Sequence, residues 1–353
     1  MTKISIVIML MIWVTCCRAE KTVFFEAETP KYIQVQVPAN SVYYKRTFEI
    51  FTEDLYGLSL TDSFEVIGKP QLIIQPVSGN RISKWTAPCC FNLGSTREVA
   101  CTTVELNFTN LHGYPPLPSA VSKLKFFMQG GVVNSVSQPE SLIKDSGQRY
   151  DYYGQTFSPN NGRYLACVSI QAKNSHQLWV LDRSVTPMLF SRVAEDYTGS
   201  ISDPDWGEDL QSHSFIFFED SNRLRFYDFT AKKVIKIYNS GEAHTADDYV
   251  NLSKYKLLSR PKVSLNYKKL LFTGESKNLL LADLNIDKKQ LENFTFLTNN
   301  PLKGYDLSSD AKAVVAAIYY RSKFVLAIFD ITNGQTKYID LGKLEPANPC
   351  WGE

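Results

Sequence analysis

The sequence predicts an all-β protein in which a β-propeller follows a strand-rich N-terminal region. Three observations predict it: a sequence unit that recurs every 46 to 55 residues, short apolar strands within each unit, and turn-forming residues between the strands. A period of this length is typical of one propeller blade with three or four antiparallel strands.

The repeated unit is an apolar strand followed by a second strand that ends on aspartate, with leucine four residues earlier. The second strands read LWVLD, LRFYD, LLLAD and LAIFD, and they end at Asp182, Asp228, Asp283 and Asp330. The strands before them read YLACV, SFIFF, KLLFT and AVVAA, continuous apolar runs of the kind that a strand buried on both faces shows. Four copies at near-constant spacing favour a propeller over a sandwich of unrelated hairpins.

Turn-forming residues precede three of the four apolar strands. They read SPNNGR at 158–163, SLNYK at 264–268 and SDAK at 309–312, whereas the second unit has LQSH instead. Asn, Asp and Gly tolerate left-handed backbone angles and bond their own main chain, so they form tight turns. The aspartate at the end of each second strand is expected to cap the reversal into a third strand. One further leucine-to-aspartate match, Leu302 to Asp306, is interpreted as a chance match outside any strand.

The best-preserved unit, FSPNNGRYLACVS followed by HQLWVLD, resembles the WD40-like propeller repeat of the TolB family. Residues 307–341 resemble the same blade, and the resemblance covers about residues 150–345. This sequence departs from the family pattern in having Asn160 in place of aspartate and an extra residue before Gly162. The resemblance implies a β-propeller that binds other proteins, and it brings no active site with it. The N-terminal domain of TolB is α/β, and no segment of this sequence has the helical periodicity that such a domain requires. Orthology to TolB is therefore not inferred.

The N-terminal region, residues 20–118, is strand-rich without the repeated unit. Alternating or apolar segments occur at 33–37, 43–51, 71–77 and 104–108, and Pro-Pro-Leu-Pro at 115–118 indicates a boundary. The predicted organisation is therefore a leader at 1–19, a β-rich region at 20–118 and the propeller at 119–353. The β-rich region is either a separate small domain or a set of degenerate blades that complete the ring.

The first 19 residues have the order of a secretory signal: Lys3, an apolar run at 4–14, and small residues up to Ala19. We therefore expect an exported protein, periplasmic or secreted, with no transmembrane segment once the leader is removed. A lipid anchor at Cys16 or Cys17 is the alternative. A lipid anchor would need a small residue directly before the modified cysteine, and Thr15 and Cys16 are poor matches, so we favour a cleaved leader without a lipid.

Five cysteines remain after removal of the leader. Cys89 or Cys90 could close a short disulfide loop with Cys101, and Cys167, inside an apolar strand, is expected to be a buried free thiol. Leader removal also lowers the 38 basic residues to 36, against 36 acidic residues. A formally neutral chain argues against a nucleic-acid partner or an anionic membrane surface held by long-range charge.

No catalytic or cofactor-binding residue is predicted. The four histidines occur in no HExxH motif, GxSxG is absent, and His176 and His213 are assigned to solvated blade turns. The one concentrated acidic segment, DPDWGED at 203–209, offers a candidate calcium site, because hard cations prefer several oxygen ligands from a short loop. Its ligands would be Asp203, Asp205, Glu208 and Asp209. We favour a solvated loop between two blades, because the spacing matches no known calcium loop.

The favoured interpretation is an exported, non-enzymatic β-propeller that acts as a protein–protein interaction or scaffold subunit of the cell envelope. The alternative is a secreted carbohydrate-active or lyase-type enzyme that uses acidic residues of the propeller channel. The alternative predicts two carboxylates at a shared funnel, roughly 5–10 Å apart. Asn-x-Ser/Thr sequons at Asn107, Asn251 and Asn293 matter only in a host that glycosylates exported chains.

Overall fold

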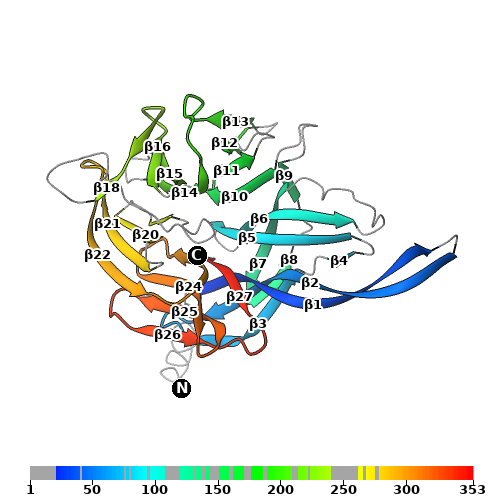
Figure 1. Cartoon of the computed structure of the whole chain (residues 1–353). Helices are drawn as coiled ribbons and strands as arrows, with labels where there is room; N and C mark the ends of the chain where they lie inside the picture. The colour runs from blue at the N-terminus through cyan, green and yellow to red at the C-terminus, as the bar shows by residue number, and fades with distance from the viewer. Residues whose placement is uncertain are drawn as a thin grey trace, which may run out of the picture.

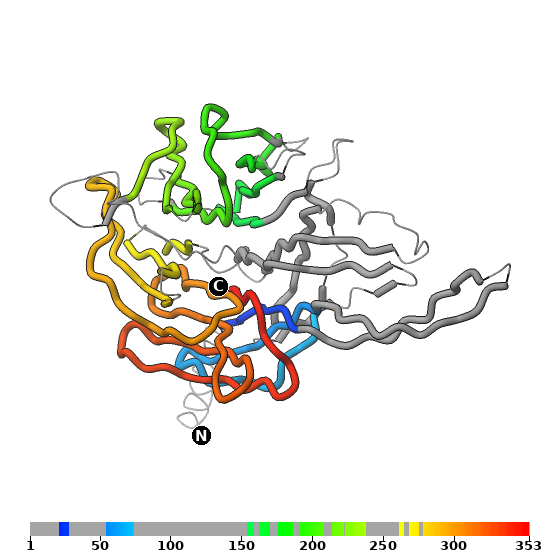
Figure 2. Tube along the Cα trace, viewed as in Figure 1, coloured from blue at the N-terminus to red at the C-terminus, as the bar shows by residue number. Residues whose placement is uncertain are grey.

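The computed structural model describes strands between Lys21 and Trp351 and, among those residues, no helix that could cross a bilayer. The fold is all-β, as predicted. Side chains are described for the residues coloured in Figure 2, which are 21–27, 54–73, 154–158, 162–169, 176–185, 189, 191–207, 214–221, 223–237, 261–264, 268–274 and 278–352. The predicted leader at 1–19, with its alternative lipid sites, and the predicted boundary at 115–118 lie outside the described residues.

Five antiparallel sheets are arranged as the blades of a propeller (Figure 1). Blade 1 has the order β27 (Pro346–Trp351), β1 (Lys21–Ala39), β2 (Val42–Leu60) and β3 (Val66–Ile74). Blade 2 contains β10 (Asp151–Phe157), β11 (Tyr164–Ile170), β12 (His176–Asp182) and β13 (Leu189–Val193). Blade 3 contains β14 (Ser202–Glu208), β15 (Ser214–Asp220), β16 (Arg223–Asp228) and β17 (Lys233–Lys236).

The last two blades follow the same meander. Blade 4 contains β19 (Lys262–Val263), β20 (Lys269–Thr273), β21 (Leu279–Asn285) and β22 (Gln290–Thr298), and the short β18 (Tyr238–Asn239) pairs in parallel with β22. Blade 5 contains β23 (Leu302–Leu307), β24 (Ala313–Tyr320), β25 (Lys323–Asp330) and β26 (Thr336–Ile339). The four predicted repeat units are the second and third strands of blades 2 to 5.

Both ends of the chain contribute to blade 1. Its first strand, β27, comes from the C-terminal end, and the other three come from the N-terminal region (Figure 1). A sixth sheet lies between blades 1 and 2, because its strand β5 contacts both β27 and β10. That sheet contains β4 (Val77–Ser78), β5 (Arg81–Leu93), β6 (Thr96–Asn107), β7 (Ala120–Gln129), β8 (Val132–Val136) and β9 (Glu140–Ile143).

The hydrophobic core lies between neighbouring blades. Successive residues of the second strands face opposite neighbours: Val314 packs in the cluster shared with blade 4, and Val315 packs in the cluster shared with blade 1. Phe217 and Phe226 of blade 3 likewise pack against Leu270 of blade 4. Because both faces are covered, apolar residues occupy successive positions of these strands, which explains the continuous runs in the sequence. Each fully buried Leu, Val or Phe contributes about 1.5–3 kcal/mol of transfer free energy.

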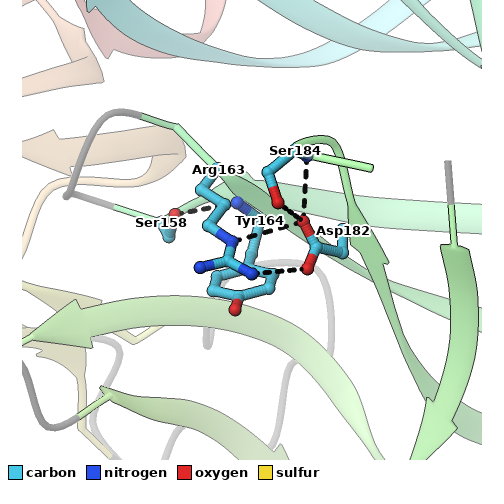
Figure 3. A network of polar contacts seen from close by, with 5 residues as sticks. All are labelled: Ser158, Arg163, Tyr164, Asp182 and Ser184. Atoms are coloured by element: carbon cyan, nitrogen blue, oxygen red, sulfur yellow. Dashed lines mark hydrogen bonds and ion pairs between the residues drawn. The ribbon is translucent and has the colours of Figure 1, made fainter. Parts of the chain in front are cut away.

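The repeat serines and aspartates hold the turns around the second strand. Ser158 Oγ accepts a hydrogen bond from Tyr164 N (3.0 Å), and Arg163 forms a two-point ion pair with Asp182 (Figure 3). The Asp182 carboxylate also accepts from Ser184 N at 2.9 Å, as the predicted cap of the strand reversal. The same serine bond recurs at Ser264 and at Ser308, one residue before the Ser309 with which the predicted turn began. The same aspartate cap recurs at Asp228 and Asp330. The repeat marks are therefore structural.

Two sequence interpretations are corrected by the first strands of the blades. Residues 302–307 form β23, so the match from Leu302 to Asp306 lies inside a strand, although this is a first strand and not the third strand that carries the repeat aspartate. The acidic segment is not a solvated loop, because residues 202–208 form β14, and Asp203 and Asp205 are buried. Such strands were missed because they are short and polar, and they lack the alternation that marks a half-buried strand.

Candidate functional site

The first strands of the blades contact one another in order around the centre of the propeller, and they carry a set of polar side chains in one shared position. In blades 2 to 5, the repeat aspartate pairs with one residue of the second strand. The shared position of the first strand pairs with the residue two places further along that second strand. We call these residues the inner ring; they are Thr156, Asp205, Lys262 and Asp306.

A β-bulge precedes the inner ring. The pairing of β10, β14 and β23 with their second strands shifts register just before the ring residue. The residue two places earlier has a positive φ in each case: 60° at Gly154, 47° at Asp203 and 123° at Gly304. Asn348 of β27 also has a positive φ, 41°. Gly, Asp and Asn are the residues that adopt this conformation at least cost, so the bulge explains their presence in the first strands.

Polar contacts link the inner ring from blade to blade. Asp205 Oδ1 accepts from Thr156 Oγ1 (3.2 Å) and from Lys262 Nζ (3.3 Å), and Asp205 Oδ2 accepts from Val263 N (2.8 Å). Asp306 Oδ1 lies 3.5 Å from Lys262 Nζ, and Asp306 Oδ2 accepts from Trp351 N at 2.9 Å. One oxygen of each carboxylate therefore accepts a hydrogen bond from a backbone N–H of the next blade. The other oxygen of each carboxylate contacts the Lys262 ammonium, which the two aspartates share.

The ring places two carboxylates on either side of one ammonium in a largely buried setting. The Asp205, Asp306 and Lys262 side chains are 11%, 15% and 20% exposed. Burial raises the pKa of Asp306 to about 6; Lys262 and the Trp351 N–H act in the opposite direction. A carboxyl group that titrates near neutral pH can donate or accept a proton, which is the chemistry that general acid–base catalysis uses.

The sequence-predicted acidic site is divided by the strand geometry. Asp205 belongs to the inner ring, and Asp203 lies at the bulge before it. The side chains of Glu208 and Asp209 lie outside the described residues. Within the described part of the chain, no group of three or more His, Cys, Asp or Glu side chains is arranged to hold a metal ion. A calcium site in this segment stays a prediction.

The structure also gives the positions of some of the histidines and cysteines that the sequence analysis singled out. His176 is not in a solvated turn: it begins β12, is half-buried, and its Nδ1 lies 3.1 Å from Ile201 O. Cys167 is a buried free thiol, as predicted, and Cys350 of β27 is also buried. The side chains of Cys89, Cys90 and Cys101 and of His213 lie outside the described residues.

Sequence reasoning missed Lys262 and Asp306 as members of a site. A signal for Asp306 was present, because GQTFS at 154–158 and GYDLS at 304–308 share the bulge glycine, the ring position and the turn serine. Lys262 has only part of this signal, because Ser264 follows it as the turn serine but Arg260 occupies the sequence position of the bulge glycine.

Two grooves lie at the outer edges of the blades, each with a cavity volume of about 630 Å³. One runs between blades 2 and 3, along Arg192, Glu195, Tyr197 and Lys233. The other runs between blades 1 and 5, with Leu58 and Ile339 among its apolar lining residues. An ion pair between Lys337 and Glu65 joins the two blades there. Both grooves mix apolar side chains with charges of both signs.

The structure is similar to solved propellers at low sequence identity. TolB from Acinetobacter baumannii matches with a TM-score of 0.52 and 14% identity over 94% of this chain and 66% of that chain. A Trypanosoma rangeli sialidase matches with a TM-score of 0.50 and 8% identity, over 88% of this chain and 58% of the sialidase. The Pseudomonas aeruginosa periplasmic gluconolactonase PpgL has a TM-score of 0.45 and 11% identity, over 94% and 99% of the two chains.

The chain spans just under two thirds of the length of that TolB. No protein-family model matches the sequence. No curated protein matches it either. The chain is a five-bladed β-propeller with a strand-rich N-terminal region, and it resembles TolB in its repeat and fold. At this identity, the likeness extends to the fold alone.

Proposed function

We propose that the chain is an exported, non-enzymatic β-propeller that acts as a protein–protein interaction or scaffold subunit of the cell envelope. The leader-like residues 1–19 and the formal charge neutrality of the remaining chain support the exported, protein-binding role. Propellers offer a rigid ring whose loops and edges remain free for recognition.

One observation carries the non-enzymatic part of the proposal. All four carboxylate oxygens of Asp205 and Asp306 have a donor on a neighbouring blade: Thr156, Lys262, or the backbone N–H of Val263 or Trp351. Satisfied buried polar networks of this kind hold elements in one arrangement. The charged side chains at the centre therefore stabilise the contacts between blades, and no substrate is needed to explain their presence.

Affinity purification from envelope fractions tests the proposal. The tagged chain, expressed with its own leader, should recover a protein partner that a tag exported alone does not. The Asp306→Asn variant should recover the same partner, because it alters the centre of the propeller and leaves the outer surface unchanged. Recovery of the chain only as a free monomer would count against the interaction role.

The enzyme alternative is favoured by a different observation. Two carboxylates lie within 3.5 Å of the same Lys262 ammonium, and burial raises the pKa of Asp306 to about 6. In a glycosidase or lyase, such a pair could serve as acid and base. Release of reducing sugar from a panel of polysaccharides, lost in Asp306→Asn while the variant stays folded, would establish this alternative.

A further inference from the structure

We propose that Asn293 is a site of N-linked glycosylation and that its glycan covers an exposed aromatic edge of blade 4. The inference rests on the export part of the proposed function, because the modification occurs on chains that enter a secretory compartment. Asn293, Phe294 and Thr295 form the Asn-x-Ser/Thr acceptor sequence. Among the three sequons of the chain, this one has described side chains.

The acceptor is accessible in the folded protein. Asn293 to Phe296 are four consecutive exposed residues of β22. The pairing of β22 with β21 shifts register next to Asn293, which has a φ of 52°. Bulges of this kind are frequent at sheet edges, where they interrupt regular pairing. The sequon is therefore presented on an irregular, solvent-facing part of the outer strand.

Apart from the bulge, the described residues of this segment have none of the usual protections of an edge strand. Among the described residues, β18 pairs only with Gln290 and Leu291, so the outer edge beyond them has no described partner strand. Phe294 and Phe296 are 45% and 56% exposed, and residues 293–298 contain neither proline nor a charged side chain. An apolar edge of this composition invites pairing with another chain. A large hydrophilic group on Asn293 would prevent it.

The modification is chemically compatible with the surrounding contacts. In the transfer, Asn293 Nδ2 attacks C1 of the reducing-end sugar of a lipid-diphosphate-linked oligosaccharide, which is the co-reactant. The N–C1 bond forms, the C1–O bond to the diphosphate breaks, the lipid diphosphate leaves with the electron pair, and the amide loses one proton. The product retains one N–H, so the bond from Asn293 Nδ2 to Asp283 Oδ2, 2.8 Å long, can persist.

The test is secretion of the full chain from a eukaryotic cell, once with its own leader and once with a leader of known function. Thr295→Ala removes the acceptor sequence and leaves Asn293 in place, and Thr295→Ser preserves the sequence as a matched control. The parent has three sequons, so we expect Thr295→Ala and Asn293→Gln each to lose one glycosidase-sensitive mobility step relative to the parent, and Thr295→Ser to keep every step. Mass spectrometry after enzymatic release should find Asn293 converted to aspartate.

The outcomes separate this inference from the proposal of export. Secretion without modification of Asn293 under both leaders overturns the inference and leaves export standing. Modification under the foreign leader alone contradicts export by the chain's own leader, and with it the occurrence of the modification on the natural chain, although it shows that Asn293 is an accessible acceptor. Shielding has its own readout: enzymatic release should increase the fluorescence of an apolar dye in the parent and not in a Phe294→Ser, Phe296→Ser chain. Equal dye fluorescence before and after release overturns the shielding role.

Discussion

Replacement of Gly304 by alanine should destabilise the propeller at its centre. The backbone at Gly304 has a φ of 123°, where an L side chain is strained at a cost of roughly 1–3 kcal/mol. A Cβ atom at this position would also lie 2.7 Å from Asn348 Cα and 2.9 Å from Asn348 N. Because backbone atoms of β27 would have to move, overpacking adds roughly 1–3 kcal/mol.

Two other glycines provide matched controls. At Gly154, of equivalent position in blade 2, a Cβ would lie 3.1 Å from Pro204 Cδ, a milder contact with a side chain. At Gly334, φ is 71° and no atom lies within 4 Å of a Cβ, so only the backbone cost remains, about 1 kcal/mol.

The expected loss in free energy of unfolding is therefore about 2–6 kcal/mol for Gly304→Ala, an intermediate value for Gly154→Ala, and about 1 kcal/mol for Gly334→Ala. Urea unfolding followed by tryptophan fluorescence measures all three. Equal midpoints for Gly304→Ala and Gly334→Ala would refute the close approach of β23 and β27 at the bulges.

Further predictions concern the inner ring and the turns. Asp306 has its pKa raised to about 6, so the stability that its protonated form contributes is present below its usual pKa of 3.8 and lost as pH rises through 6. Relative to Asp306→Asn, the parent should lose up to about 3 kcal/mol of unfolding free energy between pH 4 and pH 7; parallel stability curves would contradict this. Ser308→Ala removes the acceptor for the buried Ala313 N–H and should cost about 1–3 kcal/mol in thermal or urea unfolding. Arg163→Met breaks a pair whose arginine is half exposed and should cost less than about 1 kcal/mol, and a larger loss would show that the turn depends on it.

The sequence predicted the second and third strands of blades 2 to 5 because their environment is uniform. Residues such as Val314 and Phe217 are covered on both faces, so apolar runs and the spacing of the repeat aspartates were sufficient to locate them. The predicted cap at Asp182 follows from local hydrogen bonds alone, which sequence patterns record well.

The first strands could not be located in the same way because their partners are remote in sequence. Asp205 is held by Val263, 58 residues away, and Asp306 by Trp351, 45 residues away. Strand β27 has no apolar or alternating pattern; it joins β1, which lies at the other end of the chain. Without knowledge of these contacts, a charged residue in a short polar segment predicts a solvated loop.

The native size of the protein extracted from the envelope fraction of its own host tests the central claim most directly. A scaffold subunit should sediment as a complex larger than its own chain, which has a mass of 40.1 kDa with the leader included, and the complex should persist when Asp306→Asn replaces the parent. Sedimentation as a free monomer, together with polysaccharide cleavage that Asp306→Asn abolishes, would contradict the account and establish the enzyme in its place.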